Sequence, residues 1–93
     1  MQDITELTNF LKSLSDPTRL KIIEYLAKAD NPRCVSKISE HISVSQSATS
    51  QHLRILRQSN LVTSTRRGYH IHYEINTEQL DNALQQLQSL LKT

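Results

Sequence analysis

The chain has 93 residues, of which 37% are hydrophobic and only 4% aromatic, so it is long enough for one small domain. A core of this size is marginal alone, and we expect packing against a second copy. The sequence has no run of about 18 apolar residues for a membrane span, and its single cysteine excludes an internal disulfide bond. Residues 1–6 lack the basic-then-apolar pattern of a signal peptide, so a cytoplasmic protein is expected.

Basic charge is concentrated in the middle of the chain. The formal net charge is only +2, but residues 33–67 hold six basic side chains against one acid, a net charge of +5. The rest of the chain therefore sums to −3. This uneven distribution is typical of a nucleic-acid-binding surface, and an ordinary solubilising surface is the alternative.

Two helices are predicted before residue 30. A narrow stripe of apolar residues at helical spacing predicts a first helix over about residues 3–14: Ile4, Leu7, Leu11 and Leu14. Asp16 suits an N-cap and Pro17 suits the first position of a second helix, which is expected to end near Lys28. The residues expected to face the core from this second helix are Leu20, Ile22, Ile23, Leu26 and Ala27.

The next two predicted helices are joined by a tight turn. A short helix over about Val35–Ile42 is followed by Ser43, at a position where glycine is often found. Ser45 then suits the N-cap of a helix over residues 46–59, and Asn60 suits a left-handed stop at its end. Two helices with so short a connection form a helix-turn-helix.

The second helix of this pair has a polar face suited to DNA. Its first half carries amide and hydroxyl groups, which can meet base edges in the major groove. Its second half carries arginines, which can meet phosphates. An ordinary amphipathic surface helix is the alternative. The residues predicted to contact DNA from this helix are Gln46, Ser47, Ser50, Gln51, His52, Arg54 and Arg57.

A β-hairpin, or wing, is predicted over residues 61–75. Two strands, Leu61–Arg66 and Tyr69–Ile75, flank Arg67 and Gly68, and this only glycine of the chain supplies the positive φ that a hairpin turn requires. The arginines at the tip suit a phosphate backbone, with solvated loop arginines as the alternative. By alternation, the residues expected to face inward are Ile71, Tyr73 and Ile75, and those expected to face outward are His70, His72 and Glu74.

Asn76 and Thr77 begin a last predicted helix, over about residues 77–91, which carries a second narrow leucine stripe. Because both terminal helices of a small domain carry such stripes, we predict that both join a homodimer interface. The predicted interface residues are Leu7, Leu11, Leu80, Leu84, Leu87 and Leu91.

A combination of residues points to one family. It comprises Leu14-Ser-Asp-Pro-Thr-Arg-Leu-Lys-Ile-Ile23, Val44-Ser-Gln-Ser-Ala-Thr-Ser-Gln-His-Leu53, and Leu61-Val62 with Arg67-Gly68 and Tyr73. Together these closely resemble the ArsR/SmtB family of dimeric bacterial and archaeal transcriptional repressors, over roughly residues 10–90.

The resemblance implies a fold that is mainly α with a small β-hairpin, a winged helix-turn-helix in which four helices precede the hairpin and one follows it. All of residues 1–93 would form this single domain. The implied function is a homodimeric repressor that binds a roughly palindromic operator in double-stranded DNA and blocks transcription. The residues implied to face the major groove are Gln46, Ser47, Ser50 and Gln51, and those implied to serve the wing are Arg66, Arg67 and Tyr69.

The usual metal-ligand sets of the family are not matched here. Where the family has a Cys-Val-Cys pair, this chain has Cys34-Val-Ser36, and one thiol falls short of the four ligands that zinc requires. The positions that match the second ligand set are Thr77, Gln79, Leu90 and Thr93. We therefore expect neither a metal nor another cofactor. The alternating strand residues His70, His72 and Glu74 leave a non-standard metal site as an alternative.

The sequence also bears on functions other than DNA binding. Cys34 lies near Arg33 and Lys37 at a predicted helix start, where a lowered thiol pKa would make it redox-sensitive, and an inert cysteine is the alternative. No nucleophile–base pair, paired carboxylate or phosphate-binding glycine loop is visible, so no enzyme is expected. The remaining alternatives are a winged-helix protein-interaction module and a metal- or redox-responsive sensor with a non-standard site.

Overall fold

The computed structural model describes residues 4–92 and is mainly helical with a small antiparallel sheet. In chain order the elements are α1 (Ile4–Leu14), α2 (Pro17–Lys28), β1 (Arg33–Cys34), α3 (Val35–Ile42), α4 (Gln46–Gln58), β2 (Val62–Arg67), β3 (His70–Ile75) and α5 (Thr77–Leu91). This order confirms the predicted winged helix-turn-helix. The predicted start of the first helix near residue 3 lies outside the described residues.

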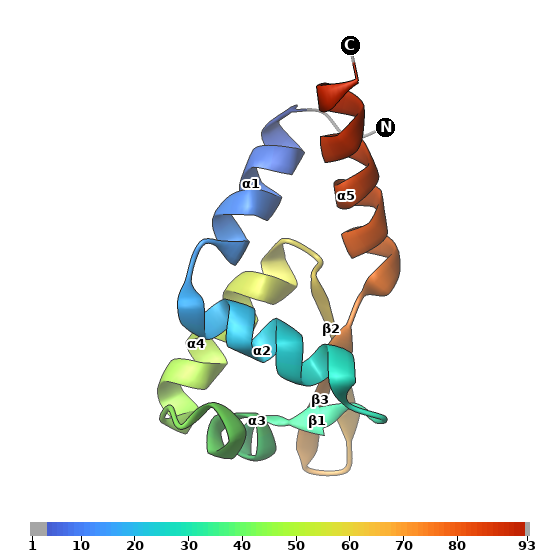
Figure 1. The fold of residues 1–93 in the computed structure, drawn as a ribbon. Helices are drawn as coiled ribbons and strands as arrows, with labels where there is room; N and C mark the ends of the chain where they lie inside the picture. Colours follow the sequence, from blue (N-terminus) through green and yellow to red (C-terminus); the bar gives the residue numbers. More distant parts are fainter. Residues whose placement is uncertain (1–3, 93) are drawn as a thin grey trace.

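The molecule is elongated, with principal dimensions of 47 × 23 × 21 Å, and α2 lies across its middle (Figure 1). Helices α1 and α5 contact each other and together form one end of the molecule (Figure 1). The start of α4 and the tip of the β2–β3 hairpin lie toward the opposite end. Over residues 4–92, no helix combines the length and apolar character that crossing a membrane requires.

The core lies where α2, α3 and α4 meet the start of β2. Ile22, Ile38 and Leu53, one from each helix, are completely buried. Burying a side chain of this size stabilises the fold by about 1.5–3 kcal/mol. The other buried apolar residues are Leu7, Phe10, Leu26, Ile42, Leu56, Leu61, Val62 and Ala83.

Side-chain caps begin three of the helices, as the sequence predicts. In each case a side-chain oxygen accepts a hydrogen bond from the backbone N–H three residues later, at 3.0 Å for Asp16, 3.1 Å for Ser45 and 3.3 Å for Asn76. Each cap satisfies an N–H that the first helical turn leaves without a partner, which is worth about 1 kcal/mol.

The inward face of α2 was predicted too broadly. Leu20 is 51% exposed and Ala27 is also exposed, whereas Ile22 and Leu26 are buried. Residues four apart share one helical face, so Ile22 and Leu26 define the buried stripe. Leu20 lies two positions before Ile22, about 200° around the helix, and therefore points away from the core.

The sheet contains a strand that was not predicted. The two-residue β1 pairs antiparallel with β3, and the strand order is β1-β3-β2. Arg33 pairs with Tyr73 and Cys34 pairs with His72. The turn position was also wrong by one residue, because Arg67 pairs with His70, leaving Gly68 and Tyr69 as the turn.

The predicted alternation along β3 holds for only part of the strand. Tyr73 and Ile75 pack against the core, but Ile71 is 39% exposed because it lies nearer the hairpin tip, beyond the core. His72, predicted to face outward, is half-buried where β1 pairs with the strand.

Ser43 and Asn60 are the described non-glycine residues with positive φ, at +58° and +62°. Asn60 confirms the predicted left-handed stop after α4. At Ser43 the left-handed conformation costs a residue with a Cβ atom roughly 1–2 kcal/mol. The turn between α3 and α4 is therefore strained at Ser43, and glycine would adopt the same backbone conformation there with less strain.

Replacing Ser43 with glycine (Ser43→Gly) is expected to raise the free energy of unfolding by about 0.5–1 kcal/mol, because relief of the left-handed strain exceeds the added chain entropy. Urea unfolding followed by circular dichroism measures this change. Asn60→Gly is the matched control and should give a smaller gain, since asparagine tolerates this conformation. A loss of stability in Ser43→Gly would contradict the assigned turn geometry.

Candidate nucleic-acid interface

The side chains that α4 exposes are polar from Gln46 to Arg57, except for Ile55, which is 36% exposed. Thr49, Leu53 and Leu56 bury the opposite face in the core, which fixes the rotation of the helix. The predicted residues that the structure leaves exposed on this helix are Gln46, Ser47, Ser50, Gln51, Arg54 and Arg57. Six of the seven side chains predicted to contact DNA from this helix therefore lie on one open surface.

A shallow groove of about 430 Å³ runs between α4 and the wing. Its lining residues are Ser47, Ser50, Gln51, Leu53, Arg54, Arg57 and Tyr73. Nη1 of Arg57 donates a hydrogen bond to Oγ of Ser64 on β2 at 3.3 Å, which joins the helix to the wing. Sequence reasoning missed Ser64 and Tyr73 as parts of this surface, although the inward position of Tyr73 was predicted.

The wing tip presents two unpaired cations. Arg66 and Arg67 are exposed, and neither forms an ion pair with another residue of the range 4–92. Tyr69, in the turn, is 99% exposed. An ion-paired arginine must lose its partner before it meets a phosphate, so these free side chains are well suited to that contact.

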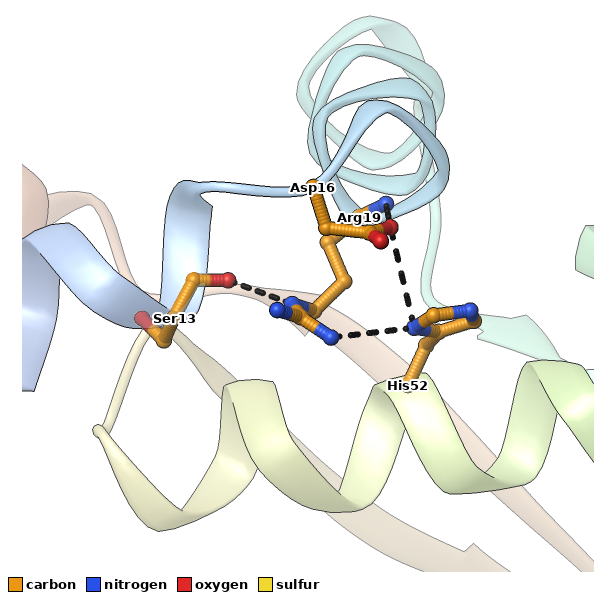
Figure 2. Close-up of polar contacts among 4 residues, drawn as sticks. All are labelled: Ser13, Asp16, Arg19 and His52. Atoms are coloured by element: carbon orange, nitrogen blue, oxygen red, sulfur yellow. Dashed lines mark hydrogen bonds and ion pairs between the residues drawn. The ribbon is translucent and has the colours of Figure 1, made fainter.

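His52 is placed differently from the other predicted contacts of α4. Its side chain is only 22% exposed and turns toward the start of α2 (Figure 2). Nδ1 of His52 lies 3.3 Å from Nη1 of Arg19 and 3.9 Å from a carboxylate oxygen of Asp16. The structure therefore gives His52 partners within the chain. The position of His52 in the sequence gives no indication that Arg19 and Asp16 lie beside it.

Cys34 is half-buried at the N-cap of α3. Its Sγ lies 3.2 Å from Oγ of Ser36. This hydroxyl, followed by the backbone N–H of Lys37, lowers the pKa of the Cys34 thiol below its ordinary value. The causes are thus hydrogen bonds rather than the side-chain charges of Arg33 and Lys37 that the sequence suggested.

The histidines of the wing do not gather with other ligands. Over residues 4–92, no three side chains of His, Cys, Asp or Glu are arranged to hold a metal ion. His70 and Glu74 are exposed. His72 lies on β3 opposite Cys34 of the paired strand β1. Thr93, one of the positions compared with the second ligand set, lies outside the described residues.

The two leucine stripes of the terminal helices are divided between core and surface. Leu7 is buried within the chain, and Leu80 and Leu87 are partly buried against the same core. The other predicted interface residues, Leu11, Leu84 and Leu91, remain exposed at 40%, 51% and 83%. Ile4 and Leu90 add to this exposed apolar surface of α1 and α5.

Comparison with known proteins identifies the family to which this fold belongs. The family model for "Bacterial regulatory protein, arsR family" matches residues 16–64, which span α2 to β2. The transcriptional repressor SdpR of Bacillus subtilis is 36% identical over 78 residues, covering 84% of this chain and 84% of that protein. An arsenical resistance operon repressor of Staphylococcus xylosus is 38% identical over 82 residues, covering 88% and 77%.

A solved structure agrees with these relatives. The ArsR-like transcriptional regulator from Rhodococcus sp. RHA1 superposes with a TM-score of 0.82 at 28% identity, covering 92% of this chain and 79% of that one. The chain belongs to the arsR family of bacterial regulatory proteins. It is a DNA-binding transcriptional regulator, not an enzyme.

The Cys34 thiol is expected to react with iodoacetamide with a pH midpoint below that of a cysteine in an unstructured peptide, because hydrogen bonds lower its pKa. Ser36→Ala should move this midpoint upward, since the thiolate loses its hydroxyl donor. Lys37→Gln is the control and should leave the midpoint nearly unchanged, because Lys37 acts through its backbone N–H. A midpoint that moves with Lys37→Gln and not with Ser36→Ala would contradict this assignment.

Proposed function

We propose that this protein is a homodimeric transcriptional repressor that binds a palindromic operator through α4 and the wing. Residues Gln46, Ser47, Ser50 and Gln51 would meet base edges in the major groove. Arg54, Arg57, Arg66, Arg67 and Tyr69 would contact the backbone beside it. As a DNA-binding protein without a membrane partner, it would act in the cytoplasm, where bacterial DNA lies.

One observation carries this proposal: the start of α4 and the tip of the β2–β3 hairpin, whose sequence includes Arg66 and Arg67, lie toward the same end of the molecule (Figure 1). The major groove of B-DNA admits one α-helix, and amides and hydroxyls there discriminate base edges. Cations on either side of the groove position the protein on the phosphates. The surface offers both kinds of group without rearrangement.

The apolar face of α1 and α5 supports the dimer. Five large apolar side chains, between 40% and 83% exposed, gather on two helices that contact each other. They are Ile4, Leu11, Leu84, Leu90 and Leu91. Contiguous exposed apolar surface marks interaction sites in small proteins, and a second copy presents the matching helices.

A two-fold dimer of this shape suits a palindrome. Helices α1 and α5 lie toward one end of the chain and the start of α4 toward the other (Figure 1), so in the proposed dimer two copies joined through α1 and α5 would each leave α4 free to meet DNA. Helix-turn-helix dimers read half-sites one helical turn, roughly 34 Å, apart. The protein-interaction module is disfavoured because it gives no role to the open polar face of α4.

Arg67→Ala is expected to weaken binding to all double-stranded DNA and to lower the slope of log affinity against log salt by about one. Fluorescence anisotropy measures this with two duplexes: one selected from a random library by the wild-type protein, and one scrambled. Glu74→Gln, which changes an exposed charge on the same hairpin, is the control and should not lower the slope. A loss confined to the selected duplex would show that Arg67 reads bases.

Gln51→Ala is expected to lower the selectivity for the selected duplex more than the general affinity for DNA. A bidentate amide contact to adenine is worth about 1–3 kcal/mol of discrimination, so the ratio of affinities for selected and scrambled duplexes should fall roughly fivefold or more. The same anisotropy titrations measure it. Equal losses on both duplexes would contradict the assignment of Gln51 to base contact.

Leu84→Glu is expected to dissociate the dimer, because it places a charge at a position of α5 where an apolar side chain is 51% exposed. Sedimentation velocity should show a monomer at concentrations where the wild-type protein is a dimer. Ile71→Glu is the matched control, an apolar residue 39% exposed on the wing, and should leave the dimer intact. A dimer that survives Leu84→Glu and dissociates with Ile71→Glu would place the interface on the wing.

A further inference from the structure

A polar cluster joins α4, proposed here as the recognition helix that enters the major groove, to α1 and α2. We name it the Arg19 cluster, and its members are Ser13, Asp16, Arg19 and His52 (Figure 2). Nε of Arg19 donates to the backbone oxygen of Ser13 at 2.6 Å, and Nη1 of the same guanidinium reaches Nδ1 of His52 at 3.3 Å. One side chain of α2 thus bridges the end of α1 and the middle of α4.

A second contact joins α1 to the far end of α4. Oγ of Ser59, the C-cap of α4, donates to Oγ of Ser13 at 3.0 Å. Ser13 is itself buried, and its hydroxyl donates to the backbone oxygen of Phe10 at 2.7 Å. The recognition helix is therefore held at its middle and at its end, and both contacts lead to the same residue of α1.

The contact at the middle of α4 depends on the proton state of His52. A guanidinium only donates hydrogen bonds, so Nδ1 accepts from Arg19 and must be unprotonated. A protonated imidazole has donors on both nitrogens and a positive charge, and it would repel Arg19. Histidine is the side chain that changes charge between pH 5 and 8.

The charged groups that face His52 are Asp16 and Arg19, both at the start of α2. The backbone N–H of Arg19 lowers the pKa of Asp16, so this carboxylate is ionised throughout the range in which histidine titrates. On α4, the residues one turn away carry no charge: Ala48, Thr49, Ile55 and Leu56. A protonated His52 would exchange its partner from Arg19 to Asp16, which lies 3.9 Å away.

We propose that Arg19 and His52 are positioning residues for DNA recognition, and that protonation of His52 moves its contact from Arg19 to Asp16, which shifts α4 and lowers selectivity for the operator. This inference rests on the proposed function. The two α4 helices of a dimer must fit two half-sites of the operator at once. The orientation of each α4 relative to α1 therefore determines whether both helices fit. Contacts with phosphates tolerate a small rotation of α4 better than base contacts do.

The test measures the ratio of affinities for the selected and scrambled duplexes at pH 8 and pH 6. Taking the ratio removes the general gain in DNA affinity that any protonated histidine supplies. For the wild-type dimer, the ratio should fall roughly fivefold at pH 6, the low end of couplings between sites. His52→Asn keeps an acceptor oxygen near the position of Nδ1 and does not titrate. It should therefore retain the ratio at both pH values.

His41→Asn is the matched control. It removes an exposed histidine of α3, stacked on Tyr25 at 4.2 Å, and should keep the pH dependence of the wild type. Arg19→Gln is a second variant that removes the bridge, and its ratio should be low already at pH 8 with no further fall. A ratio that does not change with pH in the wild type, or that still falls in His52→Asn, overturns the inference.

A second measurement tests the hydrogen bond between Arg19 and His52 in the absence of DNA. Long-range ¹H–¹⁵N spectra of the free protein at pH 8 should show His52 as the Nε2–H tautomer, because Nδ1 accepts from Arg19. The Nδ1–H tautomer would overturn the inference while leaving the proposed function intact. If the wild-type protein shows no preference for the selected duplex at pH 8, the proposed function fails, and the inference falls with it.

Discussion

Burial of one face of α4 is the constraint on which the rest of the structure depends. Thr49, Leu53 and Leu56 lie in the core with Ile22 of α2 and Ile38 of α3, and this packing fixes which side chains of α4 remain outside. A rotation of one residue, about 100°, would bury polar groups and expose leucine. The hydrophobic core therefore decides which side chains of α4 form the polar surface, and polar contacts such as that of Arg57 with Ser64 add to this packing.

The strongest local patterns of the sequence predicted most of this arrangement. The N-caps at Asp16, Ser45 and Asn76, the stop at Asn60 and the glycine of the hairpin all act within a few residues, so the order and bounds of the helices could be read directly. The polar face of α4 followed from helical periodicity, which assigns side chains to faces once a helix is known.

What the sequence could not reveal depends on contacts between distant segments. β1 is only two residues long and exists because it pairs with β3, nearly forty residues later. Leu20 is as apolar as Ile22, and only the position of the neighbouring helices decides which of them is buried. The sequence places His52 among the polar residues of α4, and only the fold brings Arg19 of α2 beside it.

The central claim is that α4 and the wing bind DNA while α1 and α5 do not. The most direct test is to follow the backbone amide signals of the ¹⁵N-labelled protein as the selected duplex is added. We expect the largest shifts on residues 46–57 and 66–70, with the signals of α1 and α5 unchanged. Shifts confined to α1 and α5, with α4 unaffected, would contradict it.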